Sequence, residues 1–289
     1  MSTPPHIPSD QNAYFTDPEN AAEMARLTRQ ARMLTQAMGG PLAEQTSLEQ
    51  VHDVLDIACG PGEWVLEMAR RYPNKRVTGI DVSHLMIEYA RFQAQQQQQD
   101  NASFKEVNIL DGLDFPDASF DLVNARLLAS FLFRTINAWP DLVQEYVRVT
   151  RPGGIIRLTE CEWPISANQA MERYSALSLK AIQITGNIFS PDGRQTSVTP
   201  MLGSFLRRAG CQDVQVHAYA VDCSNGSAFH QSFYEDMRTF MKLLQPMMVQ
   251  TGLITQEEAD KLYQKALEEV QSDNFNCLWF YLTAWGRRP

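Results

Sequence analysis

The chain has 289 residues, of which 44% are hydrophobic and 20% charged, and its formal net charge is −9. This composition is typical of a globular protein of one or two domains, and no run of about 18 apolar residues predicts a transmembrane helix. The acidic balance argues against a surface that tracks nucleic acid, because such a surface needs a basic stripe.

Cysteine and histidine usage predicts neither a disulfide framework nor a metal site. The five cysteines are widely spaced without a Cys-x-x-Cys pair, and the five histidines form no His-x-His or His-Glu-x-x-His pattern. We therefore expect reduced thiols and no resident metal. Residues 1–10 are polar and lack the basic and apolar regions of a signal peptide, so we expect a cytoplasmic location.

The first regular element along the chain is predicted to be a helix. Asp17 is a suitable N-cap and Pro18 suits the first helical position. Apolar residues then recur at helical spacing from Met24 to Met38, and the two glycines at 39–40 end the helix. Residues 1–16, which precede it, are polar and are expected to be flexible.

Strands and helices alternate after this helix. Strands are predicted at 54–58, 76–81, 102–108, 122–125 and 155–160, and helices at 64–72, 83–99, 127–133 and 139–150. This alternation predicts an α/β fold with a doubly wound, mostly parallel sheet. A helix at 200–209 and strands at 214–223 and 277–285 follow, which gives a seven-stranded sheet.

Two long segments interrupt the alternation and are predicted to be mostly helical. We expect these insertions to form a cap over one end of the sheet, where their Met and aromatic side chains suit a lid over an apolar ligand. The expected divisions are a flexible segment 1–16, a ligand-binding core 17–163, a helical insertion 164–199, a core helix and strand 200–223, a helical lid 224–274 and a final core strand 275–289.

The main binding motif is the turn after the first strand, Asp56-Ile57-Ala58-Cys59-Gly60-Pro61-Gly62. Glycines allow a tight turn there and let a ligand approach the backbone. Position 65 is Val where a dinucleotide fingerprint needs a small residue, and no Lys-Ser/Thr pair follows as in a phosphate loop. Asp81 ends the second strand, where a carboxylate can accept hydrogen bonds from both ribose hydroxyls of a nucleoside. The alternative is that Asp81 only caps the helix after Ser83.

These motifs together resemble the class I S-adenosylmethionine-dependent methyltransferase family. The resemblance rests on residues 54–64 and 79–83, with further similar stretches at 115–123, 148–154 and 283–287. It implies a Rossmann-like methyltransferase fold, S-adenosyl-L-methionine as cofactor, S-adenosyl-L-homocysteine as product and a small or medium organic acceptor. The motifs are specific for the cofactor and nearly silent on the acceptor, so methylation at O, N or C stays open.

The resemblance also implies roles for particular residues. The methionine part of the cofactor would lie against the turn, Asp81 would bind the ribose, and Arg26 would pair with the methionine carboxylate. Asn108 stands where the family commonly has an Asp that meets the adenine amine, and its amide carbonyl can accept instead. The expected cofactor-binding residues are Tyr14, Arg26, Asp56, Ala58, Gly60, Gly62, Asp81, Val82, Met86, Asn108, Ile109, Asn124 and Ala125.

In-line methyl transfer needs alignment and, for a hydroxyl acceptor, a base. The candidates are Glu160, Glu162, His217, Tyr219, His230 and Tyr234, of which we select His230 and Glu160 as catalytic. Arg126, Tyr234 and Phe189 are expected to contact the acceptor, with a structural ion pair as the alternative for Arg126.

Two other functions stay open at this point. One is a methyltransferase for a macromolecule, against which the net charge argues. The other is an S-adenosylmethionine-binding enzyme that catalyses cyclisation or rearrangement without methyl transfer. We expect a small-molecule acceptor as the partner, with no nucleic acid and no membrane, and the sequence does not decide whether the chain forms a homodimer.

Overall fold

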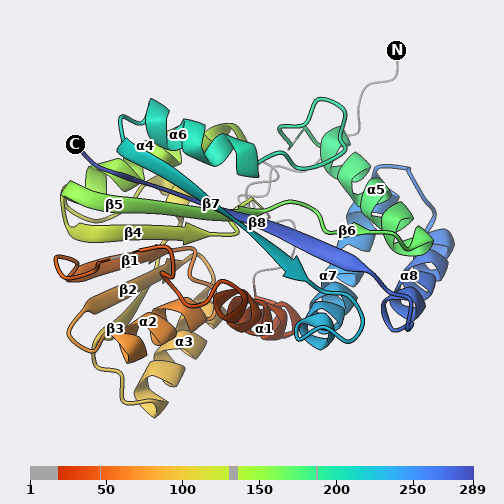
Figure 1. Ribbon diagram of the computed structural model, residues 1–289, viewed down its shortest axis with the longest axis horizontal. Coiled ribbons are helices and arrows are strands. Elements are labelled where there is room, and N and C mark those ends of the chain that lie inside the picture. The colour runs from red at the N-terminus through yellow and green to blue at the C-terminus, as the bar shows by residue number, and fades with distance from the viewer. Residues whose placement is uncertain (1–18, 46, 130–135, 187) are drawn as a thin grey trace.

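The computed structural model describes residues 19–45, 47–129, 136–186 and 188–289 (Figure 1). Its eight strands are β1 (Asp53–Ile57), β2 (Arg76–Asp81), β3 (Ala102–Glu106), β4 (Phe120–Arg126), β5 (Thr150–Cys161), β6 (Ile165–Ser166), β7 (Gln212–Asp222) and β8 (Cys277–Arg287). They form one sheet of order β3-β2-β1-β4-β5-β8-β6, and β7 also pairs with β8. Strands β1 to β5 pair in parallel and β8 is antiparallel to its neighbours, which confirms the predicted doubly wound, mostly parallel sheet.

The predicted number of strands, seven, was wrong by one. The additional strand is β6, which has only two residues. Leu278 of β8 pairs with Ile165 of β6 and also with Asp222 of β7, so β6 and β7 lie on opposite edges of β8. β6 therefore lies on the same edge of β8 as β5. A strand of two residues has no alternation of apolar and polar side chains by which a sequence could reveal it.

Helices cover both faces of the sheet. They are α1 (Ala21–Ala37), α2 (Glu63–Arg71), α3 (His84–Gln96), α4 (Trp139–Val149), α5 (Gln169–Ile184), α6 (Leu202–Arg208), α7 (His230–Gln250) and α8 (Gln256–Val270). Successive strand side chains point to opposite faces, and this divides the core. In β1, Val54 packs in the cluster formed with α2 and α3, whereas Leu55 packs in the cluster formed with α4 and α6.

Two predicted helices differ from the structure. Helix α1 begins at Ala21, with Asn20 as its N-cap, rather than at Pro18. Asn20 Oδ1 accepts a hydrogen bond from the Ala22 amide at 2.8 Å, which satisfies one of the free donors of the first turn. The helix predicted at 127–133 is absent over its described part, 127–129, where Leu127 has a left-handed φ of +57°.

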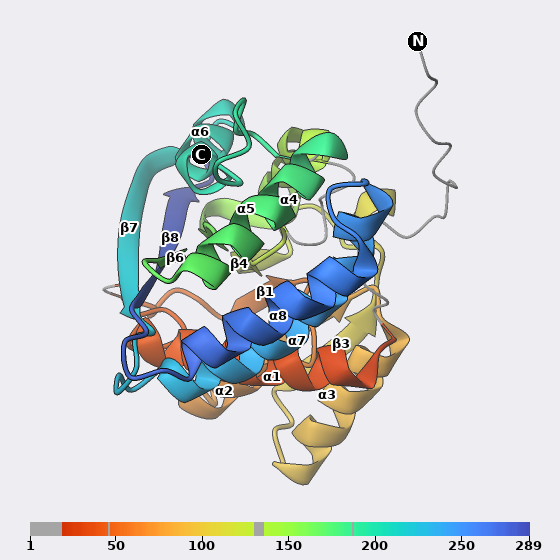
Figure 2. The same ribbon diagram turned by 90° about the vertical axis from the view of Figure 1, so that its right-hand side faces the viewer.

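Helices α5, α7 and α8 lie with α1 beyond the carboxyl ends of the parallel strands and form the expected cap (Figures 1 and 2). An apolar cluster of its own holds this cap together, with Met33 of α1, Tyr174 of α5, Met237 of α7 and Val270 of α8 among its members. Trp279 of β8 belongs to the same cluster, so the cap packs directly on the sheet. No helix in the described ranges has the length and apolar character needed to span a membrane.

Candidate functional site

A pocket lies where the strand order reverses, between β1 and β4. In doubly wound sheets ligands bind at the carboxyl ends of the strands at such a switch point. We call it the switch-point pocket, and it brings together the predicted residues Asp56, Ala58, Gly60 and Arg126. Its lining residues are Leu27, Gln30, Ala31, Leu34, Asp56, Ala58, Cys59, Gly60, Pro61, Arg126 and Leu127.

Helix α1 lies across this pocket and forms one wall of it. Arg32 pairs with Glu63 of α2, with 2.8 Å between Nη2 and Oε1, and Glu19 accepts a hydrogen bond from the Leu85 amide of α3 at 3.0 Å. These contacts tie α1 to the N-terminal ends of both helices. The pocket is therefore enclosed between α1 and the edge of the sheet.

Asp81 supports the glycine turn from the neighbouring strand. Its Oδ2 accepts from the Gly60 amide at 2.8 Å and its Oδ1 from the Ser83 amide at 3.0 Å, and the residue is 1% exposed. Burial raises the pKa of the Asp81 carboxyl, and the backbone donors oppose that rise. Ser83 itself caps the following helix, so the capping alternative for Asp81 was wrong, and the ribose contact stays a prediction.

The two glycines of the turn have different surroundings. Gly60, at φ +54°, lines the pocket, and a Cβ placed there would have no atom nearer than the Met86 sulfur at 3.8 Å. Gly62 does not line the pocket. A Cβ at Gly62 would lie 2.7 Å from Ala90 Cβ and 2.7 Å from Phe104 Cε1, so this glycine allows α2 to approach α3 and β3.

Asp56 and Arg126 are the charged groups of the switch-point pocket. Asp56 Oδ1 accepts from Asn124 Nδ2 at 2.7 Å, and Arg126 Nη1 donates to Thr35 Oγ1 at 3.2 Å. Burial raises the pKa of Asp56 to about 6, against the attraction of Arg126, and burial lowers the pKa of Arg126 to about 10. Among the described residues, Arg126 has no carboxylate within 4.0 Å, so its charge is available to a ligand.

A buried network that the sequence analysis missed fixes Asn124. Arg157 Nη1 donates to Asn124 Oδ1 at 2.7 Å, and Arg157 Nε donates to Glu44 Oε1 at 2.5 Å. Arg157 is 1% exposed, and the Asn124 side chain forms hydrogen bonds to this buried guanidinium and to Asp56. Because both ends of the amide are occupied in this way, Asn124 does not itself face a ligand. The sequence feature that could have revealed this network is the arginine inside the apolar strand at 155–158, because a buried arginine requires a partner.

The residues expected near the adenosine lie beside the pocket without lining it. Met86 and Ala125 are buried, and Val82 and Ile109 are half-buried. Asn108 caps a short 3-10 turn, where its Oδ1 accepts from the Leu110 amide at 3.2 Å. Tyr14 lies outside the described residues.

Arg26 does not reach the switch-point pocket. Its Nη2 lies 2.7 Å from Glu23 Oε1 and its Nη1 2.9 Å from Asp236 Oδ1, and the residue is buried. The guanidinium of Arg26, which the sequence analysis expected to pair with the methionine carboxylate of the cofactor, is thus already paired with two carboxylates of the protein. Arg126 is better placed for that role.

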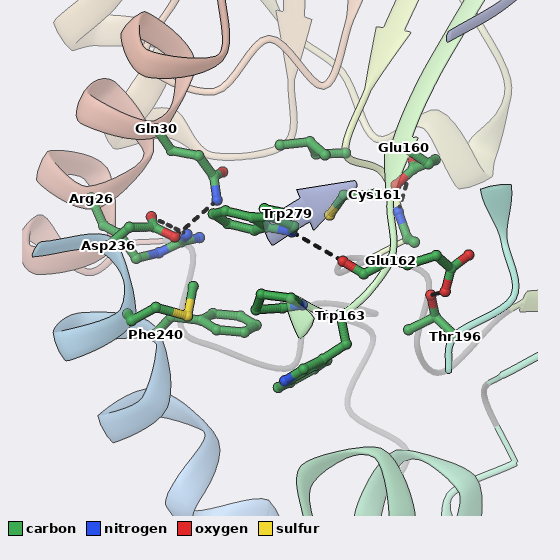
Figure 3. A pocket seen from close by; sticks show the side chains of 14 residues that line it. Arg26, Gln30, Glu160, Cys161, Glu162, Trp163, Thr196, Asp236, Phe240 and Trp279 are labelled. Carbon is green, nitrogen blue, oxygen red and sulfur yellow. Dashed lines mark hydrogen bonds and ion pairs between the residues drawn. The ribbon is translucent and has the colours of Figure 1, made fainter. Parts of the chain in front are cut away.

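A second cavity, which we call the aromatic cavity, adjoins the first (Figure 3). Gln30 and Leu127 line both. Its walls combine three aromatic rings with three carboxyl groups. The lining residues are Arg26, Gln30, Leu127, Ala129, Glu160, Cys161, Glu162, Trp163, Pro164, Thr196, Asp236, Met237, Phe240 and Trp279.

The three carboxyl groups of the aromatic cavity differ in their hydrogen bonds. Glu162 accepts four, from the backbone and side chains of the 196–199 segment, at 2.7 to 3.1 Å. Asp236 accepts from Arg26 at 2.9 Å and from Gln30 at 3.3 Å. Glu160 Oε1 accepts from the Ala129 amide at 3.1 Å, and the Leu128 amide also bonds this carboxyl group. Burial raises the pKa of Glu160 to about 8.

Three residues predicted for catalysis or acceptor binding also line neither cavity. His230 begins α7, and its Nε2 lies 2.7 Å from the Val270 carbonyl oxygen. Phe189 packs on Phe205, with ring centroids 5.7 Å apart, and Tyr234 packs at the edge of the cap cluster. The described residues also contain no group of three His, Cys, Asp or Glu side chains arranged to hold a metal ion.

Comparison with known proteins gives an independent view of the chain. Residues 54–154 match a family described as a methyltransferase domain. A demethylmenaquinone methyltransferase of Listeria welshimeri is 31% identical over 113 residues, which are 39% of this chain and 46% of that protein. The enzyme of the same name from Porphyromonas gingivalis is 29% identical over 151 residues, 52% of this chain and 59% of that protein. The chain spans about half the length of the curated relatives it matches.

Solved structures share the fold. The YcgJ protein of Bacillus subtilis has a TM-score of 0.54 at 18% identity, covering 88% of this chain and 99% of that one. Phosphoethanolamine N-methyltransferase 2 of Haemonchus contortus, solved with S-adenosyl-L-methionine, has a TM-score of 0.52 at 16% identity, covering 87% of this chain and 52% of that one. The chain therefore has the fold of these proteins, and its residues 54–154 match the methyltransferase-domain family.

Proposed function

We propose that the chain is an S-adenosyl-L-methionine-dependent methyltransferase that acts on a small organic acceptor. The observation that carries the proposal is that the switch-point pocket and the aromatic cavity meet at Gln30 and Leu127. A methyl donor bound in the first and an acceptor bound in the second would face each other there. Such alignment of two reactants supplies about 7–11 kcal/mol of the barrier reduction in favourable cases.

The switch-point pocket fits the amino-acid end of the cofactor, which supplies a methyl group activated by its sulfonium. Asp56 would accept from the ammonium, and the Arg126 guanidinium would pair with the carboxylate. We assign this carboxylate to Arg126 in place of Arg26, because Arg26 already lies between two carboxylates. The turn at Ala58 and Gly60 has left-handed φ angles, which bring its backbone to the pocket.

The remaining cofactor contacts extend this assignment toward the ribose and the base. Asp81 keeps lone pairs beyond its backbone bonds from Gly60, Val82 and Ser83, and these would accept the ribose hydroxyls. Val82, Met86, Asn108 and Ile109 would border the adenine.

The aromatic cavity is the proposed acceptor site. The relatives are named for a small-molecule acceptor, demethylmenaquinone, which supports this class of substrate. The match to the methyltransferase domain ends at residue 154, so most of the cavity lies outside it and the acceptor must be inferred from the cavity itself. Glu160 is the proposed base, because it lines the cavity beside the aromatic rings and its raised pKa suits proton acceptance near neutral pH.

Calorimetric titration with S-adenosyl-L-homocysteine tests the cofactor assignment. The unaltered protein should bind it, and Arg126→Gln should weaken binding about tenfold or more, as for loss of a hydrogen bond between charged groups at about 1.5–3 kcal/mol. Arg76→Gln is the matched control, since Arg76 is 75% exposed and pairs with Asp53 at the opposite end of the strands. Absence of binding by the unaltered protein would refute the proposed function.

Transfer of labelled methyl groups tests the reaction itself. The protein should methylate at least one member of a panel of small aromatic acceptors. Tight cofactor binding with no S-adenosyl-L-homocysteine formed across the panel would favour an enzyme that uses the cofactor without methyl transfer.

A further inference from the structure

We propose that Gln30 distinguishes the methyl donor from its demethylated product, because its side-chain amide oxygen faces the sulfur of the bound cofactor and favours a positively charged sulfonium there. This inference rests on the proposed function and adds a specificity-determining residue to it. It follows from the place of Gln30 between the two cavities, the orientation of its amide and the loss of charge at sulfur during methyl transfer.

Gln30 lies where the two cavities meet. Gln30 of α1 and Leu127, which follows β4, are the described residues that line both the switch-point pocket and the aromatic cavity. The side chain of Leu127 is apolar, so Gln30 brings the one polar side chain to this junction among the described residues. A methyl group that moves from a donor in the first cavity to an acceptor in the second therefore passes beside this amide.

A hydrogen bond to α7 fixes the orientation of the Gln30 amide. Its Nε2 donates to Asp236 Oδ2 at 3.3 Å (Figure 3). Asp236 Oδ1 forms an ion pair with Arg26 at 2.9 Å, and an ionised carboxylate only accepts, so the amide must turn its nitrogen toward Asp236. Asp236 lines the aromatic cavity and not the switch-point pocket. The amide oxygen, on the other branch of the same planar group, therefore faces the switch-point side.

The surroundings of this oxygen suit a positive charge. Gln30 is 8% exposed, and none of the described residues donates a hydrogen bond to its Oε1. A buried carbonyl oxygen that has lost its water is stabilised by a positive group or a donor in its place. A sulfonium supplies the charge, and the polarised C–H groups of its methyl supply weak donors.

Methyl transfer removes the group that Gln30 would recognise. The bond between the methyl carbon and sulfur breaks, its electron pair stays on sulfur, and the carbon forms its new bond to the acceptor. A neutral thioether is left, which offers the Gln30 oxygen neither a charge nor a donor. Because the charge on sulfur already declines in the transition state, Gln30 acts on the choice between donor and product more than on the chemical step.

Calorimetric titration of the full chain with S-adenosyl-L-methionine and S-adenosyl-L-homocysteine tests this inference. Gln30→Met keeps the length of the side chain and removes the amide, so it should lower the preference for the methyl donor over the product about threefold or more. Gln36→Met is the matched control, because Gln36 is exposed on the same helix and lines neither cavity. A purely structural role of Gln30 would weaken both ligands alike, and an unchanged ratio of the two dissociation constants would overturn the inference.

Sinefungin gives a second readout, since it carries an ammonium group in place of the methylated sulfonium. Gln30 Oε1 should accept a hydrogen bond from this group, so Gln30→Met should weaken sinefungin binding about tenfold, and S-adenosyl-L-homocysteine binding by less. Equal losses for the two ligands would contradict the proposed contact. If Gln30→Met does not fold, the unaltered protein decides the question, because it should bind sinefungin more tightly than S-adenosyl-L-homocysteine and the reverse order would overturn the inference.

The same titrations separate this inference from the proposed function. Failure of the unaltered protein to bind either S-adenosyl-L-methionine or S-adenosyl-L-homocysteine would refute the methyltransferase proposal. Binding of both ligands, with the same ratio of affinities in Gln30→Met, would refute the role of Gln30 and leave the methyltransferase proposal standing.

Discussion

Replacing Gly62 with alanine should destabilise the protein more than the same replacement at Gly60. Both residues have left-handed φ angles, +82° and +54°, which cost an alanine roughly 1–2 kcal/mol. At Gly62 the new Cβ would also lie 2.7 Å from Ala90 Cβ and 2.7 Å from Phe104 Cε1. Overpacking of this kind costs about 1–3 kcal/mol. We therefore expect a loss of about 2–5 kcal/mol at Gly62 and about 1–2 kcal/mol at Gly60.

Urea denaturation followed by circular dichroism measures these losses. Gly210→Ala is the matched control, because its φ is +88° and nothing lies within 4 Å of the added Cβ, so it isolates the conformational cost. Gly60→Ala should in addition weaken S-adenosyl-L-homocysteine binding, since its Cβ enters the switch-point pocket. A Gly62→Ala variant as stable as Gly210→Ala would refute the argument from close approach.

Three further predictions concern buried charges. Burial raises the pKa of Glu160 from 4.5 to about 8, so the folded state holds this proton more tightly than the unfolded chain, and the stability that depends on it falls as pH rises from about 4.5 to 8. Glu160→Gln should remove this decline, and denaturation midpoints that follow pH as in the unaltered protein would contradict it. Asp236→Leu should destabilise the protein less than Arg26→Met, which should cost about 3–5 kcal/mol, since Arg26 keeps Glu23 as a partner in the first variant whereas Glu23 and Asp236 both lose their ion pair in the second; an equal or larger loss in Asp236→Leu would argue against this network. Arg157→Met should cost a similar amount at pH 7 and less below about pH 4. The reason is that the pKa of Glu44, raised by burial, is lowered overall by Arg157, so the stability from this pair is present above pH 4.5 and lost in acid. An equal loss at both pH values would refute it.

The sequence predicted the alternating core well because its signals are local. β2 begins and ends where the apolar run predicted, and Ser83 caps the next helix, where its Oγ accepts from the Met86 amide at 3.2 Å. The start of α1 was wrong because Asp17 and Asn20 are both good caps and the apolar period, which begins at Met24, is compatible with either. The short strand at 165–166 depends on a partner strand from the end of the chain, which no local pattern shows.

The same distinction separates the two cavities. Asp56, Ala58 and Gly60 were assigned to one site from the sequence, because they lie at the carboxyl end of one parallel strand. Arg126 was assigned to the acceptor, whereas the structure places it with Asp56 in the switch-point pocket. His230 was selected from an aromatic-rich segment, but its ring bonds a carbonyl at the end of α8 instead of facing a ligand. Trp163 and Trp279 were missed, because the cavity they line is created by the packing of the cap on the sheet.

The charges of the two cavities explain how one chain would keep the donor out of the acceptor's site. In the switch-point pocket, Arg126 lacks a carboxylate partner among the described residues and lies near Asp56, an arrangement that complements the amino-acid end of the donor. In the aromatic cavity, Arg26 is already paired with Asp236 and Glu23, so the donor's carboxylate would find no comparable partner there. An apolar acceptor in the switch-point pocket would in turn leave both charges buried without compensation, which costs several kcal/mol. Each site thus disfavours the other's ligand, and the two ligands would meet only at Gln30 and Leu127, where both cavities are lined by the same residues.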